Sequence, residues 1–281
     1  MQNDGKLNQL FHLLPEGVLV DSAWLRQKGY STSLCSQYVA AGWLERPARR
    51  VYRRPTKTRL TWQQVVISLQ APLNKLLVVG GRTALELQGM RHYLSQEVRE
   101  VHLYGPEAPP TWLGDLHLGV RFIHHTGKRL FRNEPITRSL TSLARDIETE
   151  TGKSVDPIHG SFRQIEWGHL SFPLTVSAPE RALLELLDEL PKNESFHQVD
   201  KLMEGMSTLS PRRLKKLLAD CHSVKVKRLF FFFAERHHHR WLNQLEPESF
   251  GLGTGNRVLV KGGKLNRRYH ITVPEDLDGL W

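Results

Sequence analysis

The chain has 281 residues, 40% hydrophobic and 24% charged, with a formal net charge of +10 at pH 7. This length allows one large domain or two smaller ones, and the apolar content excludes an intrinsically disordered chain. The longest apolar runs, such as 76–79 and 229–234, are far shorter than the roughly 20 residues that span a bilayer, so we expect no membrane protein. The basic excess predicts a polyanionic partner, most often nucleic acid or an anionic membrane surface.

The start of the chain and its cysteines indicate a location in the cytoplasm. Met1–Asp4 lack a basic start followed by an apolar run, so no signal peptide is predicted. Cys35 and Cys221 are the only cysteines, too few for a disulfide framework or a cysteine-rich zinc site. We therefore expect a cytoplasmic protein that needs no metal or other cofactor, with Cys35 an inert buried thiol.

The positive charge is concentrated in three segments. Residues 1–80 hold eleven basic residues against four acidic ones, a net charge of +7. Residues 201–240 hold ten against three, and residues 251–270 hold five against none. The pattern predicts two basic surfaces separated by a more neutral body, although solvated surface charge is an equally good interpretation of the second and third segments.

The first elements are two helices around a short extended segment. Apolar spacing predicts a helix over 6–14, and 18–20 reads as extended. Asp21 or Ser22 caps a second helix, because a short oxygen-bearing side chain accepts from the unpaired amides of the first turn. Gly29 ends this helix.

A third helix and a hairpin follow directly. Ser31 or Thr32 caps the helix and Gly42 closes it. Two strands, 43–46 and 51–55, are joined by a basic turn. This order of elements predicts a winged helix-turn-helix.

The chemistry of this unit suits DNA. A helix that enters the major groove keeps its apolar side in the core and turns a small polar side to the base edges. The predicted base-facing residues are Thr32, Ser33, Ser36 and Gln37. The predicted phosphate-binding residues on the wing and its flanks are Arg49, Arg50, Arg53 and Arg54. Phosphate contacts of this kind supply much of the affinity and make it salt-dependent. The alternative is a winged helix that contacts protein and whose basic hairpin residues are only solvated surface charge.

A polar linker over 55–60 leads into a second domain. A helix begins near 60–62, and a buried strand covers 76–79. A turn at 80–83 opens another helix, and 98–104 alternates like a strand, as does 120–123.

The last third of the chain is mostly helical. Ser177 is the expected cap of a helix with Pro179 in its first turn and Glu180 at the capping-box position. Further helices are predicted over 196–206, after a cap at Ser210, and over 224–237. The strands 258–260 and 269–273 are expected to form a closing hairpin.

The pair Gly80–Gly81 is a candidate phosphate site. A glycine-rich turn between strand and helix can hold phosphate through backbone amides, and nucleotidyltransferase-like folds open in this way. Such enzymes need two neighbouring carboxylates to hold magnesium. Glu97 and Glu100 are three apart and face different sides of a strand, and Asp115 stands alone. We therefore favour a tight, closely packed turn and predict no catalytic residues.

Two further clusters remain. Three adjacent histidines, 237–239, point in different directions on a helix and cannot chelate one ion, so a helix end is the better interpretation. A second basic patch could bind RNA or nucleotide phosphates if the closing hairpin lies beside the long helix. Its predicted members are Lys225, Lys227, Arg228, Lys261, Lys264, Arg267 and Arg268.

Several blocks resemble one family. Behind the winged helix stand VVGGRTALEL (78–87), SAPERALLELLDE (177–189), SVKVKRLF (223–230), VKGGKLN (260–266) and YHITVP (269–274). Together they resemble AbiEi-type antitoxins, the antitoxin halves of abortive-infection, type IV toxin–antitoxin systems of bacteria. The resemblance covers nearly the whole chain.

The resemblance implies two activities. The amino-terminal domain would bind inverted repeats of operator DNA and repress its own operon. The remainder would neutralise a nucleotidyltransferase-like toxin, without a stable complex being required, as a defence against phage. Whether a monomer binds the repeats cooperatively is left open.

The expected protein is therefore α+β, with an N-terminal winged helix-turn-helix over 1–55 and a larger mixed α/β antitoxin domain over 56–281. The alternatives are a ligand-responsive transcriptional regulator and a degenerate nucleotidyltransferase-like enzyme.

Overall fold

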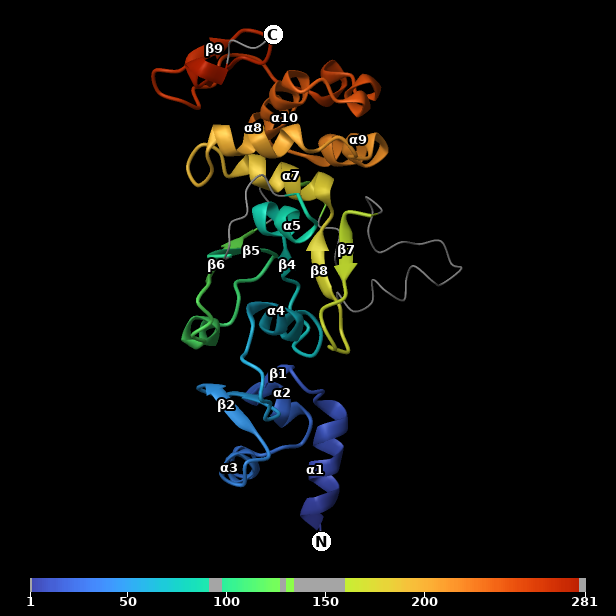
Figure 1. Ribbon diagram of the computed structural model, residues 1–281, viewed down its shortest axis with the longest axis vertical. Helices are drawn as coiled ribbons and strands as arrows, with labels where there is room; N and C mark the ends of the chain where they lie inside the picture. Colours follow the sequence, from blue (N-terminus) through green and yellow to red (C-terminus); the bar gives the residue numbers. More distant parts are fainter. Residues whose placement is uncertain (1, 91–97, 127–129, 134–159, 278–281) are drawn as a thin grey trace.

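The computed structural model describes residues 2–90, 98–126, 130–133 and 160–277. Figure 1 shows an elongated molecule with α1 to α3 at one end, a sheet in the middle and α7 to α10 towards the other end. Helices and sheets occur together throughout, which confirms the α+β class. None of the helices in the described ranges has the length and apolar character that a bilayer crossing requires.

The amino-terminal elements form a winged helix. They are α1 (Gln2–Leu13), β1 (Leu19–Asp21), α2 (Ser22–Gln27), α3 (Thr32–Ala40), β2 (Glu45–Ala48) and β3 (Val51–Arg53). The strands make an antiparallel sheet in the order β1-β3-β2. The predicted caps are confirmed, since Asp21 accepts from the Trp24 amide at 2.8 Å and Ser31 accepts from the Leu34 amide at 3.2 Å.

The winged helix has a small core of its own and also packs on the rest of the chain. Leu10, Leu25 and Tyr38 belong to the small core. Leu19 and Val51, by contrast, are buried in the large core of the molecule. The amino-terminal unit is thus joined to the rest by buried apolar surface, the main source of association free energy.

A five-stranded mixed sheet follows. Its region contains α4 (Trp62–Gln70), β4 (Val78–Val79), α5 (Gly81–Leu87), β5 (Glu100–Tyr104), η1 (Thr111–Asp115), β6 (Arg121–His125), β7 (Phe162–Ile165) and β8 (Leu174–Ser177). The strand order is β6-β5-β4-β8-β7, with β4–β8 and β5–β6 parallel. Thr61 and Gln64 form a capping box at the start of α4.

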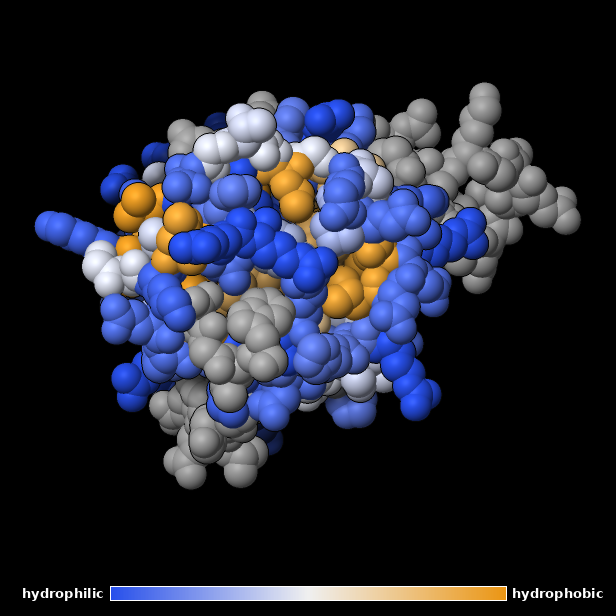
Figure 2. Space-filling view, turned by 90° about the horizontal axis from the view of Figure 1, so that it is seen from above, coloured by the Kyte–Doolittle hydropathy of each residue, from blue (hydrophilic) through white to orange (hydrophobic). Residues whose placement is uncertain are grey.

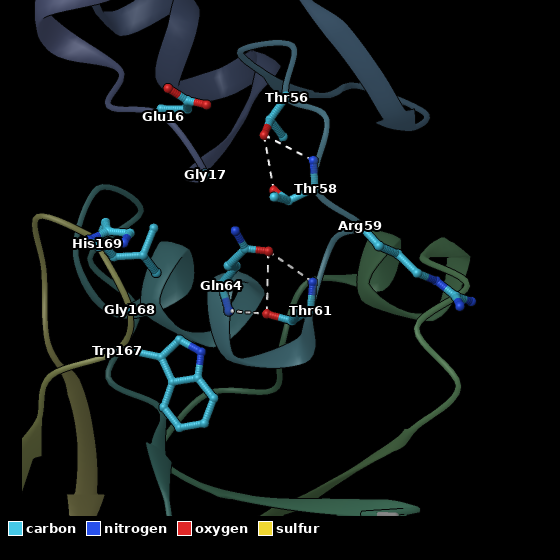
Figure 3. Close-up of a pocket in the computed structure, with 11 residues that line it drawn as sticks. Glu16, Gly17, Thr56, Thr58, Arg59, Thr61, Gln64, Trp167, Gly168 and His169 are labelled. Carbon is cyan, nitrogen blue, oxygen red and sulfur yellow. Dashed lines mark hydrogen bonds between the residues drawn. The ribbon is translucent and has the colours of Figure 1, made fainter.

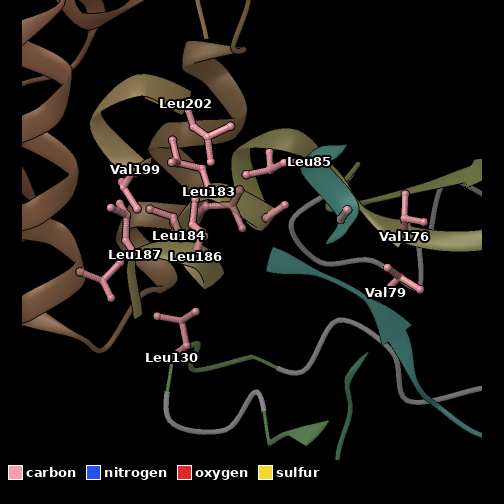
Figure 4. Packing of buried hydrophobic residues seen from close by; sticks show 14 of the residues in the cluster. Val79, Leu85, Leu130, Val176, Leu183, Leu184, Leu186, Leu187, Val199 and Leu202 are labelled. Carbon is pink, nitrogen blue, oxygen red and sulfur yellow. The ribbon is translucent and has the colours of Figure 1, made fainter. Parts of the chain in front are cut away.

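Helices cover the far end of the sheet. The elements are α7 (Pro179–Asp188), α8 (Phe196–Glu204), α9 (Pro211–Asp220), α10 (Val224–Arg236), η4 (Arg240–Gln244), η5 (Pro247–Phe250), β9 (Lys264–Asn266), β10 (Ile271–Val273) and η6 (Glu275–Leu277). Helix α7 packs against α5, α9 and α10. Figure 4 shows side chains of α5, α7, α8 and the sheet meeting in this core.

Two local predictions are wrong. The N-cap of α7 is Ala178, and Ser177 instead ends β8 with its hydroxyl donated to Glu185 at 3.0 Å. The partner of β10 is β9, not 258–260. Val258 is 71% exposed, and the amides of Leu259 and Val260 donate to Thr272 Oγ1, so a side chain replaces strand pairing there.

Candidate nucleic-acid interface

Helix α3 has one buried and one polar side. Cys35 and Tyr38 are buried in the small core, which confirms the buried thiol. The four predicted base-facing residues, Thr32, Ser33, Ser36 and Gln37, are all exposed. The Ser36 hydroxyl donates to the Thr32 carbonyl at 3.0 Å, so its oxygen remains an acceptor. The exposed side of α3 offers short donors and acceptors of the type that reads base edges.

The wing ends in two arginines. Ala48 pairs with Val51, so Arg49 and Arg50 form the two-residue turn between β2 and β3. Both are exposed, and within the described ranges no ion pair involves either one. Arg50 has the left-handed φ of 63°, and its carbonyl accepts from the Ser22 amide at 2.9 Å. In Figure 1, β2 and α3 lie on one side of this unit and α1 on the other.

Arg53 and Arg54 are placed differently from the prediction. Arg53 is 9% exposed and its Nε donates to Glu45 Oε2 at 2.7 Å. The Arg54 guanidinium lies 4.5 Å from the centre of the Phe11 ring, a cation–π contact. Arg53 therefore stabilises the hairpin in a salt bridge rather than standing free for phosphate, because β3 is the central strand of its sheet and all three of its residues are buried.

A pocket lies where the winged helix meets the second region. Its volume is about 440 Å³, and Figure 3 shows that the turn after α1, the segment before α4 and the β7–β8 turn line it. Glu16 and Gln64 supply polar groups, and the Trp167 ring forms part of its wall. The arrangement suits a small ligand with a planar part and hydrogen-bonding groups. Sequence reasoning missed it because its lining comes from three separate segments.

The Gly80–Gly81 turn is filled by a carboxylate of the protein itself. The Gly81 amide donates to Glu185 Oε2 at 2.9 Å, and Arg181 Nε donates to Oε1 at 2.8 Å. A Cβ at Gly80 would lie 2.3 Å from Glu185 Oε2. Burial raises the pKa of Glu185, against the opposing effects of Arg181 and the Gly81 amide. The turn is closely packed, as predicted, and its anion position is taken.

A buried hydrogen-bond chain joins two strands to the end of α7. His102 Nδ1 lies 2.9 Å from His125 Nε2, and His125 Nδ1 lies 3.1 Å from Glu189 Oε1. The His125 ring also stacks on Tyr104, with 4.5 Å between centroids. Burial, together with His125, lowers the pKa of His102 to about 4. No sequence spacing pointed to this chain, because its members come from three elements.

The predicted second basic patch is only partly a surface. Lys227 and Arg228 are 5% and 2% exposed, so they are not surface groups. They lie in the stretch of α10 from Val226 to Ala234 in which every residue, the four phenylalanines included, is buried. Lys225 pairs with Asp188 at 3.0 Å, and Arg268 pairs with Glu235 at 2.9 Å. The remaining members, Lys261, Lys264 and Arg267, are exposed.

The three histidines end α10, as predicted. His237 is the C-cap and its Nε2 lies 2.9 Å from Asp200 Oδ1. His239 is buried, with Nε2 2.7 Å from the Met203 carbonyl oxygen. His238 has a left-handed φ of 48°. The described part of the chain contains no group of three or more residues that could hold a metal ion.

One solved structure resembles this chain in fold. The crystal structure of the RV2827C protein from Mycobacterium tuberculosis is similar over 96% of this chain and 88% of that chain, with a TM-score of 0.53 and 14% sequence identity. This likeness concerns the fold alone. No curated protein matches the chain.

Two family models cover nearly the whole sequence. The model described as a transcriptional regulator, AbiEi antitoxin of type IV toxin–antitoxin systems, matches residues 98–274, and that of the AbiEi antitoxin N-terminal domain matches residues 3–96. The class is thus a transcriptional regulator. The chain belongs to the AbiEi antitoxin family, which confirms the resemblance.

Proposed function

We propose that the winged helix binds operator DNA and represses the operon that encodes this antitoxin. The observation that carries the proposal is the pairing of an exposed polar side on α3 with two exposed wing arginines, Arg49 and Arg50, that have no ion-pair partner among the described residues. Arginine charges of this kind bind phosphates, and the α3 residues then meet base edges. Inverted repeats are the expected DNA target.

A gel-shift titration on the promoter tests this proposal. With ~4–6 phosphate contacts, log affinity should fall against log salt with a slope of about −4 to −5. Replacing Gln37 with Ala should weaken binding to the operator more than binding to random DNA, because a base contact carries the sequence preference. A flat salt response would exclude the DNA-binding assignment.

We further propose that the part of the chain behind the winged helix neutralises a nucleotidyltransferase-like toxin. The support is the family membership together with the extensive core behind α4, which makes this part the larger body of the molecule. A stable complex is not required by the proposal. The division of the chain at residue 55 stays a prediction, as does the absence of catalytic residues.

A full-length Arg49→Gln, Arg50→Gln variant separates the two activities. Both side chains lie at the wing tip, outside the large core, so the body should fold normally. The variant should lose repression of a promoter reporter and still rescue growth of cells that express the toxin. Loss of both activities in a well-folded variant would contradict the division of labour. The ligand-responsive alternative stays a prediction, for which the pocket beside Trp167 is the place to look.

A further inference from the structure

Two cations of α10 are buried beneath a glycine-rich segment, residues 250–257, which we name the glycine loop. Lys227 Nζ donates to the Phe250 carbonyl at 2.6 Å. Arg228 Nε donates to the Leu252 carbonyl at 2.7 Å, and its Nη1 donates to the Gly255 carbonyl at 2.8 Å. Within the described ranges neither cation has a carboxylate partner, which is unusual because buried charges are normally paired.

These hydrogen bonds fix the direction of three peptide planes. In a trans peptide the N–H points opposite to the C=O. Because the carbonyls of residues 250, 252 and 255 point inward to the cations, the amides of Gly251, Gly253 and Asn256 point away from them. The loop therefore turns its donor side outward and its acceptor side inward.

The outward amides are available. Six of the seven residues from Gly251 to Arg257 are glycine, polar or charged, and all six are exposed. In the described structure none of the amides of residues 251–256 donates to another backbone group. Gly251, Gly253 and Gly255 have φ values of 60°, 69° and 75°, the alternating left-handed conformation of backbone concavities that bind anions.

The charge around the loop has one sign. From residue 249 to residue 274 the sequence has five basic and no acidic residues. Arg228 Nη2 is buried without a hydrogen-bond partner and lies 3.8 Å from where a Cβ of Gly253 would be. Burial, and the positive charge of Arg257, both lower the pKa of Arg228. In the view of Figure 2, hydrophilic residues predominate on the visible face, with smaller hydrophobic patches between them.

We propose that the glycine loop is an anion site that binds phosphate groups through the outward amides of Gly251, Gly253 and Asn256 and the side chain of Arg257. The buried Lys227 and Arg228 orient the loop and add positive potential without touching the ligand. This assignment goes beyond operator binding and toxin neutralisation, because it lies in α10 and the loop rather than in the winged helix.

The ligand class follows from what surrounds the loop. The loop is too small and polar to hold an apolar ligand. Its own Phe250 is 9% exposed and the neighbouring Tyr269 is 2% exposed, so neither ring is available to stack on a base. Recognition is therefore of phosphate alone. The triphosphate of a nucleotide and the backbone of a single-stranded RNA present this same chemistry.

Calorimetry on the full-length protein with inorganic triphosphate tests the site. Arg257→Gln should weaken binding about tenfold, the effect of one lost charge-assisted hydrogen bond. Gly253→Ala should weaken it as well, because φ is left-handed and the new Cβ would lie 3.3 Å from Val224. The matched control is Lys216→Gln, which changes another exposed basic residue, on α9. It should change the affinity less than twofold.

Two further arms identify the source of the phosphate. ATP and a labelled ten-nucleotide RNA are titrated into the Arg49→Gln, Arg50→Gln variant, which lacks the two positive charges of the wing tip. An affinity for ATP equal to that for triphosphate supports a nucleotide as the ligand. A higher affinity for the RNA supports a nucleic-acid backbone. Absence of binding to all three probes would overturn the proposal. Equal losses from Arg257→Gln and Lys216→Gln would also overturn it, because they would mean diffuse attraction without a site. If Gly253→Ala fails to fold, the Arg257→Gln comparison still decides.

Discussion

The backbone amide of Leu19 donates a hydrogen bond to Ser68 Oγ at 2.8 Å, and both residues are fully buried. Leu19 lies in β1 of the winged helix and Ser68 lies in α4. The Ser68 hydroxyl in turn donates to the Gln64 carbonyl at 2.6 Å. A polar bond therefore fixes the winged helix on α4 in a region that is otherwise apolar, and it sets the orientation of the DNA-binding unit.

Ser68→Ala should destabilise the protein. The substitution removes the side-chain acceptor of the Leu19 amide and leaves that donor buried, at a cost of about 1–3 kcal/mol. Thermal unfolding followed by circular dichroism measures the effect. Ser33→Ala, on the exposed side of α3, is the control and should leave the melting temperature unchanged. Equal melting temperatures of Ser68→Ala and the parent protein would show that the hydrogen bond does not hold the winged helix on α4.

Arg50→Gly should separate stability from DNA affinity. Arg50 has a φ of 63°, which costs an L-residue about 1 kcal/mol and costs glycine nothing. Glycine also loses more entropy on folding, so the melting temperature should stay close to that of the parent. Removal of one phosphate contact should reduce the salt slope of operator binding by about 1.

The control for Arg50→Gly is Arg53→Gly. Arg53 is paired with Glu45 in the sheet, so this variant should lose stability. If Arg50→Gly keeps the salt slope of the parent, the wing tip does not contact phosphate.

Local features of the fold were predictable, and contacts between distant segments were not. The caps at Asp21, Ser31 and Ser210 follow from short-range chemistry, and the structure confirms them. The bond from Gly81 to Glu185 joins residues 104 positions apart, and no spacing in the sequence signals it. The incorrect prediction of a strand over 258–260 has a similar cause, since three apolar residues carry too little information to define a register.

The polar site on α3 could be predicted because helical periodicity alone separates its buried and exposed sides. The burial of Lys227 and Arg228 could not be obtained in this way. One signal was present: four consecutive phenylalanines, 230–233, face all directions of a helix, so the middle of α10 is enclosed, and Lys227 and Arg228 directly before them are buried with it.

Gly80→Ala should be strongly destabilising. The new Cβ would lie 2.3 Å from Glu185 Oε2 and 2.4 Å from Tyr104 Cδ2, and both neighbours are buried. Since neither can retreat in a packed core, we expect a loss of more than ~3 kcal/mol in the free energy of unfolding. Urea titration measures it. Gly114→Ala is the matched control, because no atom lies within 4 Å of its Cβ position. A small loss of unfolding free energy in Gly80→Ala would mean that the turn has room for a ligand.

The buried His102 should make stability fall in mild acid. Its pKa is about 4 in the folded protein, lowered by burial and His125, against about 6.5 when unfolded. Above pH 6.5 the imidazole is neutral in both the folded and the unfolded state, so its titration takes nothing from the free energy of unfolding. Between pH 6.5 and 4 the unfolded chain binds a proton that the folded protein does not, so stability decreases as pH falls. The expected loss at pH 5 is roughly 2 kcal/mol.

His102→Gln removes this titration and should flatten the dependence of unfolding free energy on pH between 7.5 and 5, although the variant is less stable at pH 7.5 because the bond to His125 is altered. His12→Gln, at an exposed position of α1, should keep the slope of the parent. The slope, rather than the absolute stability, carries the test, since a purely structural loss lowers the curve at every pH. An unchanged slope in His102→Gln would assign the acid sensitivity to other groups, of which Glu189 at the end of the same chain is the first to examine.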